Sequence, residues 1–163
     1  MTLFANHKIS LRFISGCVIM SLLLLFVVLA ATIVSAADES AGSLRKKKGD
    51  VLIERHGNIL KAEDGTSVYP NDTVSTGANS SVGIIFKDNS RISLGSNSRL
   101  ELKQFVFEPA QRQFSMFNKL IKGTASFISG KMTKLSPDSV ILETPSATIG
   151  VRGTTYHVMV RED

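Results

Sequence analysis

Short runs of alternating apolar and polar residues, separated by turn residues, restrict this chain to β-structure. In the run 81–87, for example, Val82, Ile84 and Phe86 occupy every second position. Clusters of Gly, Asn, Asp, Pro and Ser separate such runs at 56–58, 70–72, 77–80, 88–90 and 95–98. A period of two, with turns about every eight to twelve residues and no convincing amphipathic helix, predicts an all-β domain. We expect an antiparallel sandwich or barrel; near-repeated units around Ser81, Arg91 and Arg99 leave a short β-solenoid as the alternative.

Two places depart from simple alternation. The apolar positions are even in 100–102 but odd in 105–107, so the parity changes at Gln104. Such a change predicts a β-bulge or a corner between sheets. The segment 114–121 fits both a strand and a helical turn, and we expect a strand because alternation continues through 123–127.

An uncharged apolar segment, 13–37, precedes all fourteen acidic residues. Two basic residues stand before it and small residues end it, which is the pattern of a secretory signal peptide. We expect a signal peptide over residues 1–36, cleaved between Ala36 and Ala37. The alternative is an uncleaved anchor helix, since the segment is long enough to span a bilayer. The first reading predicts a periplasmic or secreted protein. The second predicts an inner-membrane anchor with the domain outside the cytoplasm.

The remaining chain divides into a polar linker, 37–48, and a β domain, 49–160. The linker carries the basic run 45–48. Seventeen basic and fourteen acidic residues follow position 36, so the excess of positive charge is small and does not predict nucleic-acid binding. The only cysteine, Cys17, lies in the apolar segment, which leaves the exported part without disulfides or thiol chemistry.

The most strongly patterned stretch is 144–160, close to the C-terminus. Two alternating runs are separated by Arg152-Gly153-Thr154, and Thr144-Pro145 precedes the first. This predicts a pair of strands, or one long bent strand, with a corner at Arg152. We expect Gly153 to need either a positive φ or a close backbone approach. Arg152 is expected to cap carbonyls or pair with a carboxylate, with ligand contact as the alternative.

Residues that carry chemistry do not form a recognisable catalytic or metal-binding pattern. His56 and His157 are far apart in the chain, and there is no HExxH or GxSxG motif. Asp88-Asn89-Ser90 offers calcium ligands, but turn chemistry explains it better. The GxxG at 150–153 lacks the helices that a KH domain places around that loop. We therefore predict no catalytic residue, no metal and no cofactor; a hydrolase that uses turn Asp and Ser residues is the least supported alternative.

The order of these motifs resembles the FecR-domain family. The resemblance covers about 49–160, and its most specific part is the closing segment with Thr144, Pro145, Arg152, Gly153 and Thr154. The other matching positions are Gly65, Asn71, Asp72, Val74, Thr76, Asp88, Asn89, Ser90, Ile92, Leu94, Gly123, Phe127, Ala147, Val151, Tyr156 and Val158.

The resemblance implies an all-β extracytoplasmic domain. Family members first described regulate iron-dicitrate uptake and carry a cytoplasmic anti-sigma segment before the membrane helix. Only twelve residues precede the apolar run here, so we expect that role not to carry over. The expectation is a non-enzymatic exported module for binding, sensing or scaffolding, with an envelope protein or polysaccharide as partner and membrane contact only through an uncleaved N-terminal segment. The alternative is a membrane-anchored signalling regulator of transport or sigma-factor pathways.

Overall fold

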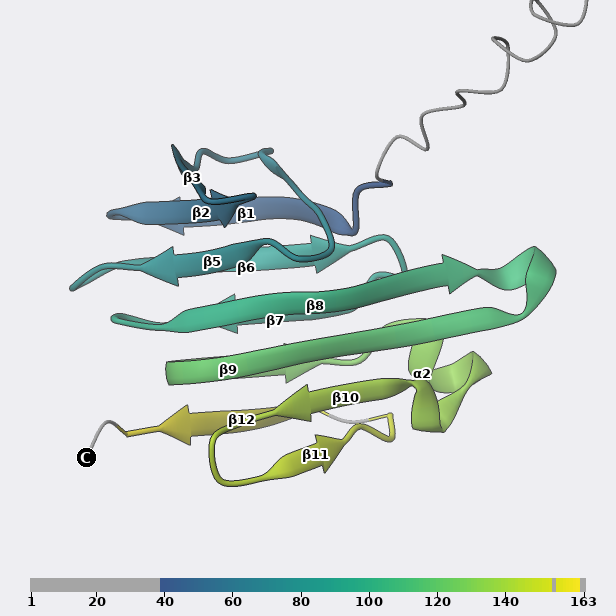
Figure 1. Cartoon of the computed structure of the whole chain (residues 1–163). Helices are drawn as coiled ribbons and strands as arrows, with labels where there is room; N and C mark the ends of the chain where they lie inside the picture. The colour runs from purple at the N-terminus through teal and green to yellow at the C-terminus, as the bar shows by residue number, and fades with distance from the viewer. Residues whose placement is uncertain (1–38, 154, 162–163) are drawn as a thin grey trace, which may run out of the picture. The chain divides into compact units, whose positions relative to one another are not determined.

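Twelve β-strands form two facing sheets in residues 39–153 and 155–161, which the computed structural model describes. Figure 1 shows one sheet in front of the other, so the predicted all-β sandwich is confirmed. The expected signal peptide, 1–36, and its cleavage site at Ala36 and Ala37 lie outside the described residues. Within the described part, no helix is both long and apolar enough to cross a membrane.

Each sheet is built from strands that are far apart in the chain. Sheet A has the order β4-β1-β6-β7-β9-β12, and sheet B the order β3-β2-β5-β8-β9-β10-β11. All neighbours are antiparallel except β9 and β10, which are parallel. The strands are β1 Gly42–Lys48, β2 Val51–Arg55, β3 Asn58–Lys61, β4 Ser67–Val68, β5 Thr73–Thr76, β6 Ser81–Phe86, β7 Arg91–Leu94, β8 Arg99–Glu108, β9 Gln113–Ile128, β10 Val140–Glu143, β11 Thr148–Gly150 and β12 Thr155–Val160. Three short helices complete the fold: η1 Pro109–Gln111, α2 Met132–Leu135 and η2 Pro137–Ser139.

Strand β9 belongs to both sheets and joins them. Its first part, 113–122, pairs with β8 in sheet B, and its second part, 123–128, pairs with β12 in sheet A. The change of sheet occurs at Gly123, whose φ is +87°. A Cβ at Gly123 would lie 2.3 Å from Ser98 Oγ and 2.5 Å from Ser98 Cα. The corner therefore needs glycine both for its backbone conformation and for its space.

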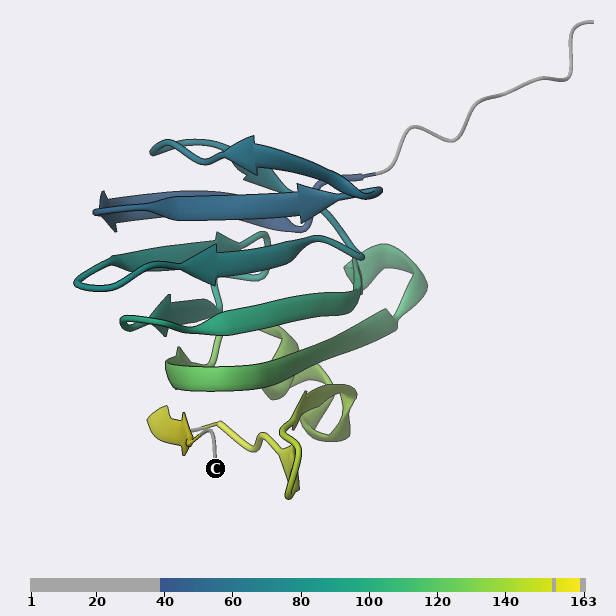
Figure 2. The same ribbon diagram turned by 60° about the vertical axis from the view of Figure 1, so that its left-hand side comes forward.

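The chain also crosses between the sheets three times at this same end. The crossings are β-arches at 49–50, 77–80 and 95–98, and Figure 2 turns this end toward the viewer. Thr76 ties two arches together, because its Oγ1 donates to Gly95 O (2.6 Å) and accepts from Ser98 N (2.9 Å). Successive arches run in opposite directions, since β2 and β5 are antiparallel. The near-repeats in the sequence therefore belong to a sandwich of alternating arches rather than to a solenoid.

One hydrophobic core fills the space between the sheets. Period two places the apolar side chains of every strand on the inner side, and their burial drives the two sheets together. The largest fully buried side chains are Leu44, Val51, Ile53, Ile84, Ile92, Leu94, Leu100, Leu102, Met116, Leu120, Phe127 and Met132.

The structure settles three expectations about local structure. The pairing of β8 with β9 shifts register between Leu102 and Gln104, which confirms the bulge predicted from parity. The ambiguous segment 114–121 is a strand within β9. Residues 42–48 were expected in the linker, and this is wrong, because they form strand β1. Its buried Leu44 enters the core while Arg45 next to it stays exposed, an alternation that the run of charges conceals.

Candidate functional site

The first half of the closing motif shapes a tight turn. Thr144 is buried, its N donates to Ala147 O (2.8 Å), and Ala147 N donates to Thr144 Oγ1 (2.9 Å). Pro145 follows at the position where its fixed φ suits a turn. The Thr144-Pro145 pair thus joins β10 to β11, and its geometry is that of a folding element.

The second half of the motif leads from sheet B to sheet A. Val151 is buried and donates its N–H to Val140 O (3.0 Å), which fixes the chain just before the corner. The Arg152 side chain is 78% exposed, and its Nε lies 4.0 Å from Asp138 Oδ1, which is itself exposed. Gly153 has a φ of +58°, a backbone conformation that favours glycine. Nothing beyond its chain neighbours lies within 4 Å of the position that a Cβ would take, so the expected close backbone approach is absent. Thr154 lies outside the described residues.

Strands β11 and β12 do not pair with each other. β11 pairs with β10 in sheet B and β12 pairs with β9 in sheet A, so the closing stretch is a bent segment that crosses the sandwich edge. A binding role for Arg152, Gly153 and Thr154 stays a prediction.

Asp72, which belongs to the family motif, is the centre of a partly buried charge pair. Its side chain is 1% exposed and accepts from Arg55 Nε and Arg55 Nη2, both at 2.8 Å. It also accepts from Tyr69 N (2.8 Å), and the Arg55 guanidinium lies 4.3 Å from the Tyr69 ring centroid. The hydrogen bond to Asp72 raises the pKa of Arg55. All of these contacts hold the loop before β5 in place, so Asp72 has a structural role.

Asp88 also has a structural role. It is fully buried, and its carboxylate accepts from Ser90 N (3.0 Å) and Met132 N (3.2 Å). Its carbonyl accepts from Lys131 N (2.7 Å). The turn explanation of Asp88-Asn89-Ser90 therefore fits the geometry, and no group of three or more His, Cys, Asp or Glu able to hold a metal occurs among the described residues.

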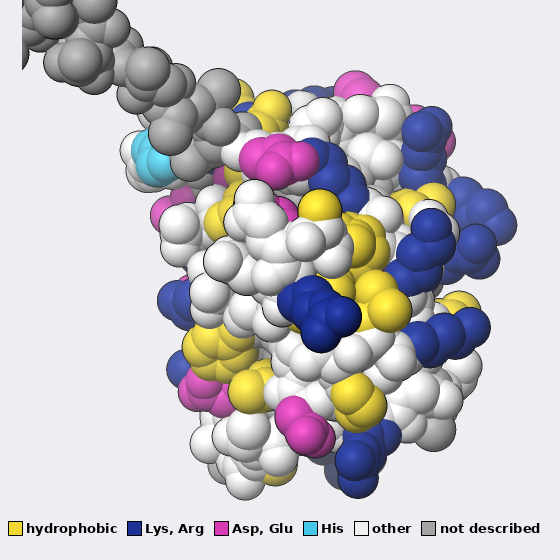
Figure 3. Space-filling view, turned by 90° about the vertical axis from the view of Figure 1, so that its right-hand side faces the viewer, with side chains coloured by type: hydrophobic (Ala, Val, Ile, Leu, Met, Phe, Trp, Pro, Cys, Tyr) yellow, Lys and Arg dark blue, Asp and Glu magenta, His cyan; other side chains and the backbone are white. Residues whose placement is uncertain are grey.

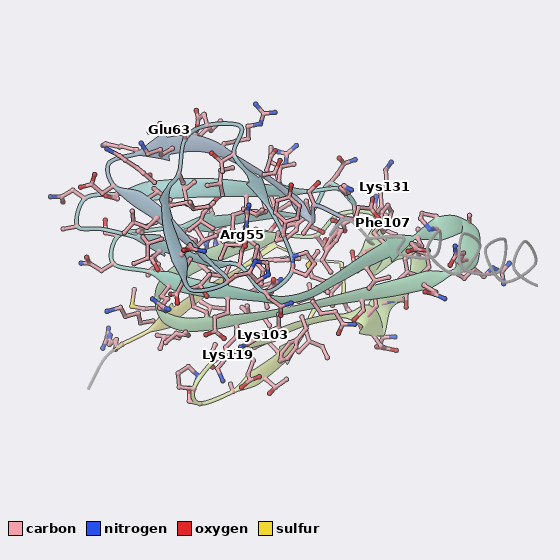
Figure 4. The ribbon with its side chains drawn as sticks, turned by 45° about the horizontal axis from the view of Figure 1, so that its top comes forward. Arg55, Glu63, Lys103, Phe107, Lys119 and Lys131 are labelled. Carbon is pink, nitrogen blue, oxygen red and sulfur yellow. The ribbon has the colours of Figure 1, made fainter. Side chains whose placement is uncertain are left out.

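The outer face of sheet B carries charges that pair with each other. Arg99 Nη2 lies 2.8 Å from Glu54 Oε2, and Lys119 Nζ lies 2.9 Å from Glu143 Oε1. The hydrogen bond to Glu143 raises the pKa of Lys119. A further pair joins Lys103 to Glu101, and Figure 4 shows Lys103 and Lys119 close together beside β8 and β9.

The outer face of sheet A is different, because no carboxylate lies on its described strands. Inward and outward side chains alternate, so the outward positions follow from the buried ones. They are Ser43, Arg45, Lys48, Ser81, Gly83, Ile85, Arg91, Ser93, Thr124, Ser126, Ile128, Thr155, His157 and Met159. Arg45, Lys48 and Arg91 are exposed, and within the described part of the chain their side chains make no ion pair or hydrogen bond. We call this surface the basic face.

A shallow groove of about 430 Å³ crosses the basic face between β7, β9 and β12. Ser93, Thr124 and Ser126 contribute hydroxyl groups to it. His157 and Met159 line it from β12, and Met159 is 63% exposed. The groove is lined mainly by apolar atoms, with Leu94, Ala125 and Val158 also contributing, and it offers hydrogen-bond donors and acceptors among them.

The end of the sandwich opposite the arches carries the half-buried aromatic residues Phe105, Phe107 and Phe114. The β8–β9 hairpin extends beyond the other strands there (Figure 1), with Phe107 against Phe114 at a centroid distance of 5.9 Å. A hollow of about 380 Å³ lies between this hairpin and Leu135, which is 56% exposed. Figure 4 places Phe107 and Lys131 at this end, and Figure 3 shows apolar and basic side chains interspersed on it. Ser40, near the start of the described chain, lines a second hollow beside Phe105 and Phe107.

Comparison with known proteins gives one match. The model of the family described as FecR protein matches residues 72–163, more than half of the chain. The chain belongs to the FecR family. That family is linked to signalling at the cell envelope, and it is a regulatory family rather than an enzymatic one. No curated protein and no solved structure matches the FecR chain.

Sequence reasoning missed the residues of the basic face. Arg45 and Lys48 were assigned to the linker and precede the family match, and Arg91 was used only to mark a strand. The signal that could have found them is the alternation of Gly42, Leu44 and the following charges, which places apolar residues on one side only. Arg55 was missed as well, because its partner Asp72 is seventeen residues away.

Proposed function

We propose that this FecR protein is an exported, non-enzymatic binding module of envelope signalling, and that the basic face of sheet A is its contact surface. The observation that carries the proposal is the set of three exposed basic residues without partners on a face without carboxylates. Positive charge that is not neutralised within the domain is available to an external partner. On sheet B, by contrast, Arg99, Lys103 and Lys119 are paired with Glu54, Glu101 and Glu143.

The non-enzymatic part of the proposal is supported by how the candidate acids are used. The carboxylates of Asp72 and Asp88, both on the family motif, accept backbone and side-chain hydrogen bonds that shape turns. A general acid or base must reach a substrate proton, and these buried groups face the domain interior. The family assignment agrees, since the family is regulatory.

Retention on envelope material tests the proposal. Full-length tagged chain is mixed with washed envelope fragments, and the bound fraction is measured after sedimentation. The double charge reversal Arg45→Glu with Arg91→Glu should lose most of the retention. The matched control Lys61→Glu with Arg112→Glu changes the same charge at exposed positions outside the basic face and should retain it. Equal retention of all three proteins would refute the basic face as the contact surface.

A membrane-anchored regulator is the second candidate, because the uncharged apolar segment 13–37 is long enough to span a bilayer if it is retained. N-terminal sequencing of the exported protein decides the question, because a chain that starts at Ala37 has no anchor.

A further inference from the structure

We propose that the basic face binds a carboxylate-bearing polysaccharide, which lies across strands β1, β6, β7, β9 and β12. This inference rests on the proposed function and names the ligand class of the same surface. It is carried by the position of the basic residues, by their lack of internal partners, and by the groove that continues from them.

The strand register places five outward positions, from Arg45 to His157, in one transverse row. Arg45 is opposite Gly83, Gly83 is opposite Ser93, Ser93 is opposite Ser126, and Ser126 is opposite His157. Four strand spacings separate the ends of the row, about 19 Å in all. The row has the shape of a path for an extended chain rather than of a pocket for a small molecule.

The basic half of this path lies over β1, β6 and β7. Arg45 and Lys48 come from β1, and Arg91 is two residues from Ser93 along β7. Arginine presents a planar fork of donors that matches a carboxylate, so two free guanidinium groups favour carboxylates over neutral sugars. Because two strand spacings, about 10 Å, separate β1 from β7, the charge is spread in the way that repeated acidic units are spread along a polymer.

The other half of the path suits the neutral parts of a sugar chain. The groove of about 430 Å³ brings together the hydroxyls of Ser93, Thr124 and Ser126 with the His157 imidazole. Hydroxyls both donate and accept, as sugar hydroxyls require. Met159 provides an apolar wall against which the CH groups of a sugar ring can pack.

The same face lacks the large aromatic residues on which single-stranded nucleic acids stack. None of the outward residues on its described strands is Phe, Tyr or Trp, whereas single-stranded nucleic acids stack their bases on such aromatic side chains. Protein interfaces usually centre on a buried Trp, Tyr or Arg anchor within an apolar patch. Here Gly83, Ser93 and Ser126 occupy the central row, and the outward apolar residues Ile85 and Ile128 lie on either side of the exposed Arg91.

Binding to polygalacturonate, a polysaccharide with a carboxylate on each sugar, tests the inference. The full-length protein in detergent micelles is titrated with polygalacturonate, and its Kd is measured at low and at high salt. Arg45→Ala with Arg91→Ala should weaken binding about tenfold, since each exposed charge contact contributes up to about 1 kcal/mol. Lys61→Ala with Arg112→Ala removes the same charge elsewhere and should change the Kd less than about twofold. Thermal unfolding shows that each variant is folded.

Four outcomes would overturn the inference. Equal binding of dextran, a neutral polysaccharide, would mean that carboxylates are not recognised. Equal loss in both double variants would mean that net charge, and not the basic face, controls binding. No binding to polygalacturonate, or tighter binding to vesicles of equal parts phosphatidylglycerol and phosphatidylcholine, would reject the polymer. In the last case the envelope-retention assay can still succeed, so failure of the ligand class is distinguishable from failure of the proposed function.

Discussion

The two outer faces of the sandwich use charge in opposite ways. On sheet B, Arg99 is held by Glu54 and Lys119 by Glu143, so each of these two cations has a carboxylate from another strand. On sheet A, Arg45 and Arg91 have no such partner among the described residues. The difference cannot come from the fold itself, because both faces are outer surfaces of antiparallel strands with similar alternation.

The comparison separates charges that belong to the folded domain from charges that are open to a partner. Exposed pairs stabilise a protein only slightly, but they do neutralise a surface. A face that keeps its positive charges unpaired gains nothing in stability and attracts anions. The variants below test whether the two faces differ in this way, beginning with the largest expected effect.

Gly123→Ala should destabilise both faces together. An alanine there would adopt a left-handed conformation and place its Cβ 2.3 Å from Ser98 Oγ, so we expect a loss of about 3 kcal/mol or more. Because β9 belongs to both sheets, urea unfolding should remain a single transition at a lower midpoint. Two separate transitions would show that the sheets, and hence their faces, are independent units.

Gly153→Ala is the matched control for that substitution. Its φ is also positive, at +58°, but nothing lies within 4 Å of the Cβ position. We expect only the conformational cost, about 1 kcal/mol. A loss as large as that of Gly123→Ala would give the family-motif corner a packing role that its open surroundings do not suggest.

Asp72→Asn should show how much a partly buried ion pair contributes to the stability of the domain. The substitution breaks the two-pronged contact with Arg55, which is itself 27% exposed, and we expect a loss of about 2 kcal/mol. Glu54→Gln breaks the more exposed pair with Arg99 and should cost about 0.5 kcal/mol. Urea denaturation of both variants measures the difference. Equal losses would remove the distinction between structural pairs and surface pairs.

The sequence alone predicted the features that depend on neighbouring residues, and it did not predict those that join residues far apart in the chain. Alternation at 81–87, the parity change at Gln104 and the strand at 114–121 are local patterns, and each was predicted correctly. The arch contacts of Thr76 and the partner of Arg55 join residues about twenty positions apart, and no local pattern contains them. For the same reason the basic face was not predicted, since only strand order brings Arg45 and Arg91 to one surface.

Tyr156→Phe should stabilise the edge of sheet A that β12 forms. The Tyr156 hydroxyl is buried and has no hydrogen-bond partner within the described residues, while its ring stacks on Phe127 at 5.2 Å. Phenylalanine keeps the stack and removes the buried polar group, so the free energy of unfolding should rise by about 1 kcal/mol. A decrease measured by urea unfolding at neutral pH would mean that the hydroxyl is hydrogen-bonded in solution.

The same residue predicts how stability responds to alkaline pH. Burial raises the pKa of Tyr156 above its ordinary value. The unfolded chain then loses this proton first as the pH rises, so stability is complete below the unfolded pKa of about 10 and falls above it. In Tyr156→Phe, which leaves Tyr69 as the one tyrosine, the loss of stability at alkaline pH should be smaller. An unchanged pH profile would assign the alkaline loss to other groups.

Arg45→Ala with Arg91→Ala should have the smallest effect on stability and so gives the sharpest test of the comparison. Both side chains are exposed and lack internal partners, so the free energy of unfolding should change by less than about 0.5 kcal/mol. The same double variant is expected to lose most of its polygalacturonate affinity. A loss near 2 kcal/mol would instead mean that these charges stabilise the sandwich, and the two outer faces would then no longer differ in how they use charge.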